Sequence, residues 1–345
     1  MSVLDDTVSG LERFLSKVWE GDVSVGGVSM ASAGARRRNV LFEATAPDGS
    51  RVAAVATIIP TAGMQLMDIE VEASNLRLAR AAGVPAPGVL AVCTDPAFVG
   101  GPFFVTERVE GETVPRRVLR LIDAHSGLGA DLARQCGAAF ARLHAVPVER
   151  AHPSLVGPGD RTPAAAALAQ VERSLAALLQ PSPVFELAFR WLARSQPSVG
   201  RGPVVIHSDF RNGNMIVGQD GLRAVLDWEG CHLGDAMADV SWMCVRMWRF
   251  GRDELEVGGF GHRTDLRAGY EEAGGRWDED SFHWWKTLGT LRWGMGLAGQ
   301  ARAHLDGSFR SIVMAASGRR VAELEYDALM LLGAAYRGAS VTSKP

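Results

Sequence analysis

Residues 204–217 read VVIHSDFRNGNMIV, and after a short turn residues 224–229 read AVLDWE. Each segment starts as an apolar strand and then presents acidic or amide side chains. Phosphoryl transfer needs a carboxylate that orients and deprotonates the attacking hydroxyl, and it needs oxygen ligands for magnesium. Asp209 is the candidate carboxylate, and Asn214 and Asp227 are the candidate metal ligands. The spacing therefore predicts a phosphotransfer site in a loop between strands.

The N-terminal part of the chain predicts a small antiparallel sheet. Its valine- and alanine-rich segments are separated by turn residues, and Asp48-Gly49 is a hairpin signal between two of them. Gly83, Pro85 and Pro87 are expected to end a helix. We expect strands at 22–30, 37–46, 51–59, 88–94 and 102–108, an amphipathic helix at 5–20 and an inserted helix at about 65–82.

From residue 113 onward the apolar residues recur mainly at helical spacing. We expect helices at 115–123, 128–145, 164–179, 183–195, 235–250 and 278–305, and short strands at 203–206 and 222–227. These patterns predict an α+β fold with segregated lobes, one over residues 1–110 and one over 111–345. Residues 251–264 contain four glycines and are a candidate mobile flap.

The composition limits the partners that the chain is expected to have. A formal net charge of -3 gives no reason to expect a nucleic acid. The apolar runs are shorter than the roughly 18–20 residues that span a membrane, and no basic and then apolar leader is visible, so we expect no membrane partner and a cytoplasmic location. Four widely spaced cysteines suit reduced thiols: Cys93, Cys136, Cys231 and Cys244.

The two motifs resemble the catalytic-loop and metal-binding motifs of the aminoglycoside phosphotransferase and choline kinase superfamily. His207-Ser208-Asp209 with Asn214 matches the first motif, although the family usually has glycine at the middle position, and Leu226-Asp227-Trp228-Glu229 matches the second. Within this superfamily, the sequence most resembles the branch that is fused to acyl-CoA dehydrogenases. The resemblance implies a bilobal protein-kinase-like fold. Its five-stranded antiparallel N-terminal lobe, residues 1–110, would bind the nucleotide, and its larger, mainly helical C-terminal lobe, residues 111–345, would carry out catalysis and bind the acceptor.

The resemblance also implies roles for individual residues. ATP and magnesium would be the cofactors, and a small-molecule hydroxyl would be the acceptor. Asp209 would be the catalytic base, with Arg211 two residues later, and His207 would brace the loop by hydrogen bonds rather than carry a proton. Asp235 and Asp239 are expected to cap a helix or to brace the same loop.

In the N-terminal lobe the resemblance points to the nucleotide-binding parts. Gly26, Gly27 and Ser29 look like a phosphate-covering loop, provided that they lie between two strands. Glu72 looks like the first-helix glutamate, and residues 102–111 look like the interlobe hinge. Within that hinge the nucleotide would be bound by Thr106, Glu107 and Val109.

One expected group is missing. In this fold the third strand normally supplies a lysine or arginine that grips the donor phosphates and pairs with the helix glutamate, and Thr57 occupies that position here. The chain has few lysines, so an arginine is the expected replacement. The candidates are Arg36, Arg37, Arg38 and Arg211. Without such a partner Glu72 would be an ordinary exposed helix residue.

The acceptor and the activity are less constrained. One or two tryptophans are expected to line an apolar acceptor pocket while the others pack in the core: Trp242, Trp248, Trp284, Trp285 and Trp293. The acidic residues at 253–256 and 278–280 are too sparse to indicate a polycationic aminoglycoside. Two alternatives remain, a non-catalytic protein that binds a nucleotide or metabolite and an enzyme of this fold with altered chemistry. Asp209, Asn214 and Asp227 together argue against a pure binder.

Overall fold

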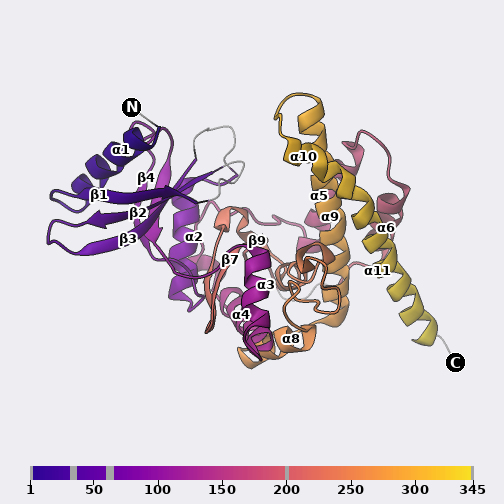
Figure 1. The fold of residues 1–345 in the computed structure, drawn as a ribbon. Helices are drawn as coiled ribbons and strands as arrows, with labels where there is room; N and C mark the ends of the chain where they lie inside the picture. The colour runs from indigo at the N-terminus through magenta and orange to yellow at the C-terminus, as the bar shows by residue number, and fades with distance from the viewer. Residues whose placement is uncertain (1–2, 32–36, 60–65, 199–201, 343–345) are drawn as a thin grey trace.

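The computed structural model describes residues 3–31, 37–59, 66–198 and 202–342, which form two lobes (Figure 1). The N-terminal lobe contains a five-stranded antiparallel sheet, as predicted, in the order β1-β2-β3-β5-β4. Its strands are β1 (Ser24–Met30), β2 (Arg38–Thr45), β3 (Arg51–Ile58), β4 (Val89–Cys93) and β5 (Phe103–Glu107).

The two faces of this sheet have different neighbours. Side chains alternate along a strand, and on β3 one set is buried in a cluster with helix α1 (Val3–Val18): Ala54, Ala56 and Ile58. Thr57 belongs to the other set, opposite Phe104 of β5. Phe104 is buried in the cluster that includes helix α2 (Ile69–Ala81). The Thr57 face is therefore the one turned toward α2 and the second lobe.

The C-terminal lobe is mainly helical. Its helices are α3 (Pro115–Asp123), α4 (Leu128–His144), α5 (Pro163–Ala176), α6 (Pro183–Arg194), α7 (Ala236–Trp242), α8 (Arg263–Glu272), α9 (Glu279–Leu305), α10 (Ile312–Ser317) and α11 (Val321–Thr342). The first four agree with the prediction to within a few residues. Helices α8, α10 and α11 were not predicted. The short strands β7 and β9 lie on the side of this lobe that faces the sheet (Figure 1).

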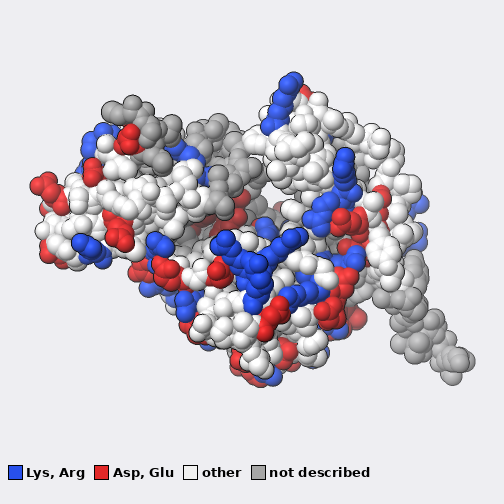
Figure 2. Space-filling view, in the orientation of Figure 1, with Lys and Arg blue, Asp and Glu red and all other residues white. Residues whose placement is uncertain are grey.

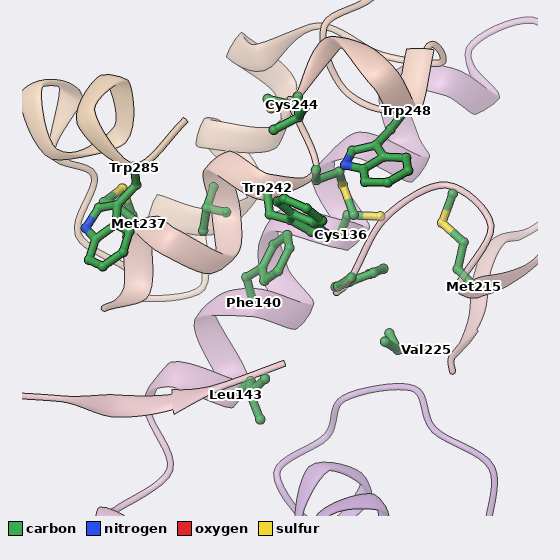
Figure 3. Close-up of a cluster of buried hydrophobic side chains, with 14 of the residues drawn as sticks. Cys136, Phe140, Leu143, Met215, Val225, Met237, Trp242, Cys244, Trp248 and Trp285 are labelled. Carbon is green, nitrogen blue, oxygen red and sulfur yellow. The ribbon is translucent and has the colours of Figure 1, made fainter. Parts of the chain in front are cut away.

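Two short antiparallel pairs of strands flank the predicted site. Strand β6 (Val204–Ile206) pairs with β9 (His232–Gly234), and β7 (Met215–Gly218) pairs with β8 (Gly221–Val225). Met215 of β7 and Val225 of β8 belong to a buried cluster that also includes Phe140 and Trp242 (Figure 3). Dense packing of this kind fixes the ends of the strands, and so fixes the loops that leave them.

Two predictions for this lobe are wrong. A single helix over 235–250 does not form, because the backbone becomes extended at Val245 and only a 3-10 helix, Arg246–Arg249, follows. Residues 251–264 do not form a free flap. Val257 and Phe260 are buried there, and the Asn212 side-chain amide donates to the Gly258 carbonyl at 2.8 Å. Hydrophobic burial and this hydrogen bond hold the glycine-rich segment against the lobe.

Two further expectations concern the chain as a whole. Within the described ranges no helix is both long and apolar enough to cross a membrane. The four cysteines are buried as free thiols. A lobe boundary after residue 110 remains a proposal.

Candidate active site

His207 anchors the catalytic loop where β6 ends. Its Nε2 donates to the Leu226 carbonyl at 3.0 Å, and its Nδ1 accepts the Asp209 backbone N–H at 3.2 Å. A carbonyl can only accept, so Nε2 carries the proton. Burial lowers the pKa of His207, which keeps the ring neutral. His207 therefore joins the two motifs as a fixed support, as expected, and it is not arranged to carry a proton.

Asp239 of α7 braces the same loop from below. Its carboxylate accepts the backbone N–H groups of His207 at 2.8 Å and Ser208 at 2.7 Å, and it lies 3.3 Å from His144 Nε2. Burial works against the charge, but these hydrogen bonds and the two histidines lower the pKa of Asp239. Asp235 caps α7 through the Met237 N–H at 2.8 Å. The supporting roles expected for both aspartates are confirmed.

Ser208 departs from the glycine of the resembling motif, and its backbone shows why glycine suits the position. Its φ is +67°, in the left-handed region that side chains rarely adopt. The hydroxyl donates to the Gly230 carbonyl at 2.8 Å. One hydrogen bond therefore offsets a backbone strain of about 1–2 kcal/mol.

Two substitutions should separate these effects. Ser208→Ala keeps the strain and loses the hydrogen bond, so we expect it to lower the free energy of unfolding by about 1 kcal/mol. Ser208→Gly loses the hydrogen bond but relieves the strain, so we expect it to unfold within about 0.5 kcal/mol of the parent. Urea denaturation measures both. A glycine variant as unstable as the alanine variant would show that the strain is negligible.

Asp209 is held at both carboxylate oxygens. Its Oδ1 accepts from Arg211 Nε at 3.0 Å and from Trp242 Nε1 at 2.8 Å, and its Oδ2 accepts from Asn214 Nδ2 at 2.6 Å. The Arg211 guanidinium lies 4.4 Å from the centre of the Trp248 ring. The Asp209 side chain is 31% exposed. A carboxylate that is oriented by three donors and still accessible is arranged to receive a proton from a bound hydroxyl.

Asn214 and Asp227 lie side by side. The Asn214 carbonyl accepts the Leu226 N–H at 2.9 Å, which places Asp227 next to it at the end of β8. Burial and the nearby Glu229 and Asp209 charges raise the pKa of Asp227 to about 6, although Arg37 opposes this. The described residues contain no group of three or more acidic, histidine or cysteine side chains for a metal. An amide beside one carboxylate fits magnesium, which takes few protein ligands and completes its shell with water and phosphate.

Arg37 supplies the cation that is missing from the third strand. Its guanidinium binds Glu72 of α2 through two hydrogen bonds, of 2.7 and 2.9 Å. It also binds Glu229 at 2.5 Å and lies 3.6 Å from Asp227. The Glu72 side chain is 1% exposed, so it is not an ordinary surface residue. Arg37 therefore joins the two lobes at the site.

The electrostatics of this pair favour its ionised form. Burial raises the pKa of Glu72, and the Arg37 guanidinium opposes that shift. Burial would also lower the pKa of Arg37, but the hydrogen bonds and charges of Glu72, Glu229 and Asp227 outweigh it and raise that pKa. The two-point geometry is that of a charged guanidinium and carboxylate, in which both partners stay ionised.

The other candidate cations have different contacts. Arg38 donates to the Val99 carbonyl at 2.8 Å, away from the site, and Arg211 contacts Asp209. Arg36 lies outside the described residues. Thr57 donates its hydroxyl to Asn39 Oδ1 at 3.0 Å. Asn39 of β2 pairs directly with Thr57 of β3, and Arg37 comes just before β2, two residues from Asn39.

Comparison with known proteins places the chain in a family. Residues 28–277 match the model of the phosphotransferase enzyme family. The chain belongs to this family. Acyl-CoA dehydrogenase family member 10 of Mus musculus is 29% identical over 192 residues, which are 55% of this chain and 17% of that protein. The chain thus spans under a fifth of that curated relative.

Two solved structures have the same fold as this phosphotransferase family member. A Ralstonia eutropha JMP134 protein assigned as an aminoglycoside phosphotransferase is 21% identical, with a TM-score of 0.68, over 92% of this chain and 97% of its own. Aminoglycoside phosphotransferase APH(4)-Ia, in a ternary complex with AMP-PNP and hygromycin B, is 17% identical, with a TM-score of 0.59, over 92% and 98%. Together these confirm the bilobal α+β phosphotransferase fold.

The predicted phosphate-covering loop of this phosphotransferase is misplaced. Gly26, Gly27 and Ser29 lie inside β1, around an irregularity in its pairing with β2, and not between two strands. Gly27 has a φ of +62°, which bends the strand there. The connection between β1 and β2 runs over residues 31–37, of which 32–36 are outside the described residues. Phosphate binding by these three residues stays a prediction.

The predicted hinge, residues 102–111, contains β5 and the four residues that follow it. Thr106 is buried, and the Glu107 carboxylate accepts from Arg80 at 3.0 Å and from the Gly88 N–H at 3.2 Å. The Glu107 side chain therefore has a structural role, so any nucleotide contact there would have to use the backbone. Base binding by Thr106, Glu107 and Val109 stays a prediction.

A cavity of about 320 Å³ opens beside the catalytic loop. As predicted, two of the five tryptophans line it, Trp242 and Trp285. Its wall is mainly apolar, with Ile206, Leu233, Leu288 and Met295. Ser208 also lines it, so the cavity reaches the residue that precedes Asp209. The sequence did not indicate Arg292 of α9, which lines it too.

Proposed function

We propose that this phosphotransferase moves the terminal phosphoryl group of ATP to a hydroxyl of a small molecule with the help of magnesium. The observation that carries the proposal is the fixed Asp209 carboxylate, beside the Asn214 and Asp227 pair and under the Arg37 cation. In the reaction a hydroxyl oxygen forms a bond to phosphorus, the bond from phosphorus to the ADP oxygen breaks, and the hydroxyl proton moves to Asp209.

Each residue would have a separate part in this reaction. Asn214 and Asp227 would hold magnesium, which when bound neutralises phosphate charge. Asp209 would orient the hydroxyl, because both of its oxygens are already fixed by protein donors. Arg37 would bind phosphate oxygens while Glu72 holds it in place. Buried free thiols suit the cytoplasm, which we propose as the location.

A non-catalytic binding protein is the second candidate. It was favoured by Thr57, and Arg37 removes much of that support because a cation does stand beside Glu72. Hygromycin B, which is bound in the ternary complex of APH(4)-Ia, is not a good guide to the acceptor here, because the cavity wall is mainly apolar. Thermal shift and calorimetry with magnesium and ATP test nucleotide binding, and nucleotide consumption over a metabolite library tests transfer. Tight binding without transfer to any library member would favour the binding protein.

The raised pKa of Asp227 leads to a prediction about pH. A carboxyl group with a pKa of about 6 is protonated below that pH, and magnesium needs the carboxylate. We expect the affinity for magnesium-ATP to be steady above pH about 7 and to fall by up to about tenfold per pH unit below pH about 6. Binding should also release a proton near pH 6, because the metal favours the charged form.

Calorimetry in buffers of different ionisation enthalpy measures both effects. Asp227→Asn should lose most of the magnesium-dependent affinity and the pH dependence with it. Asp220→Asn, in the exposed turn between β7 and β8, is the matched control and should behave like the parent. A parent affinity that is the same at pH about 5 and about 7 would remove Asp227 from the metal site.

A further inference from the structure

Arg292 lies in the cavity beside Asp209, where no carboxylate of the described ranges pairs with it. Its side chain is exposed, lines the cavity, and donates to the Ser208 carbonyl at 3.3 Å. Its guanidinium lies 4.6 Å from the centre of the Trp242 ring. No described carboxylate forms an ion pair with it, whereas Arg37, Arg211 and the exposed Arg246 have acidic partners. On the face of the molecule in Figure 2, acidic and basic side chains lie close together at several places.

Keeping the Arg292 guanidinium charged in this cavity costs free energy, because it loses some contact with water and gains no carboxylate of the described residues in return. The surrounding protein partly desolvates the guanidinium and so lowers the pKa of Arg292, although the side chain is exposed in the cavity. The two carboxylates that act on it are already bound elsewhere, Asp209 by three side-chain donors and Asp239 by two backbone N–H groups. A partly desolvated cation that no protein carboxylate compensates is a ready partner for an anion.

The other charged or titratable side chains described in the cavity form no ion pair with Arg292. Asp235 caps α7, and burial raises its pKa. Arg173 donates to Gln170, at 2.5 Å, and His232 contacts the Gly230 carbonyl through Nδ1, while burial lowers the pKa of its ring. Apolar residues form most of the remaining wall. Among the described residues the cavity thus offers two arginines without a carboxylate partner, and Arg292 is the one that contacts the Ser208 carbonyl beside Asp209.

We propose that the acceptor of this enzyme is a hydroxy acid, whose carboxylate binds Arg292 and whose apolar body fills the cavity. The inference rests on the proposed function for its hydroxyl, which must reach Asp209. Trp242 fixes the distance between the two ends, since Arg292 lies over its ring and its Nε1 donates to Asp209. Carboxylate and hydroxyl are therefore separated by a short chain that runs past one indole.

Binding in the absence of nucleotide tests the site separately from the reaction. The probes are medium-chain hydroxy acids with the hydroxyl at successive carbons, each compared with its primary amide, by calorimetry on the full chain. We expect at least one acid to bind roughly ten- to hundredfold more tightly than its amide, as a charge-assisted hydrogen bond provides. Arg292→Gln should abolish this preference, and Arg292→Lys should keep part of it. Arg302→Gln, on the same helix but outside the cavity, is the matched control.

The outcomes separate the two proposals. Equal binding of every acid and its amide, or no binding by any of them, overturns the anion site, and the parent protein alone gives this result even if the variants do not fold. A second result also overturns the anion site. If Arg292→Gln loses affinity for magnesium-ATP but still binds the acid more tightly than its amide, Arg292 binds the nucleotide and not the acceptor. An acid preference without phosphoryl transfer from magnesium-ATP supports the anion site and contradicts the proposed function.

Discussion

Replacing Asp209 by asparagine should lower kcat by about 10²–10⁴, the range for the loss of a general base. Asparagine keeps the size of the side chain and its oxygen can still accept from Trp242 or Arg211, so the loop should stay in place. Affinity for magnesium-ATP should change little, because Asp209 is expected to meet the hydroxyl and not the nucleotide. Steady-state kinetics on an acceptor found by the library screen, with calorimetry for the nucleotide, measure the two quantities separately.

The exposed Asp220→Asn variant serves as the control for this experiment as well. A further comparison comes from Trp242→Phe, which removes one donor to Asp209 and leaves the carboxylate. It should reduce kcat far less than Asp209→Asn. If Asp209→Asn turns over at a rate similar to the parent, the base lies elsewhere and the proposed reaction is wrong in its central step.

Removing Arg37 should affect both stability and binding. Arg37→Ala leaves the buried Glu72 carboxylate without its partner, and breaking a buried ion pair in this way costs about 3–5 kcal/mol of unfolding free energy. It should also weaken magnesium-ATP binding by roughly 10- to 150-fold, the contribution of one guanidinium to a phosphate. Urea denaturation and calorimetry give the two values.

Double variants separate the two effects of Arg37. Adding Glu72→Gln to Arg37→Ala should recover much of the stability, because no buried charge remains, but not the nucleotide affinity. Adding Thr57→Lys should recover part of the affinity, because Thr57 pairs with Asn39, which is two residues from Arg37. Arg38→Ala, whose guanidinium points to Val99, is the control. Unchanged affinity in Arg37→Ala would mean that Arg37 only tethers the lobes.

The catalytic loop was the most predictable part of the molecule. Asp209 and Asn214 are five residues apart, so local backbone geometry alone brings their side chains together. Asp227 follows a hairpin that turn chemistry also indicates. Arg37 was only one of four candidates, because its neighbours Glu72 and Glu229 are distant in sequence and come together through the packing of the lobes.

Helix α8 was not predicted, and the glycine at its centre, Gly269, has a low helix propensity. A side-chain carbon on Gly269 would lie 2.0 Å from the Arg134 carbonyl of α4, and one on Gly137 would lie 2.1 Å from the Leu266 carbonyl of α8. Glycine here allows two helices to approach closely, a tertiary requirement that outweighs its low helix propensity. Composition cannot distinguish that use of glycine from a turn. Arg292 was missed for a similar reason, since a lone arginine in a helix shows no sign of the cavity it faces.

Arg37 is surrounded by three carboxylates, those of Glu72, Asp227 and Glu229. One guanidinium against three acids leaves two uncompensated negative charges, the charge that a single divalent ion carries. In the proposed reaction a nucleotide without metal would meet this excess as repulsion, whereas its magnesium complex would bring the balancing charge with it. We therefore expect the triphosphate to enter the site only together with its divalent ion.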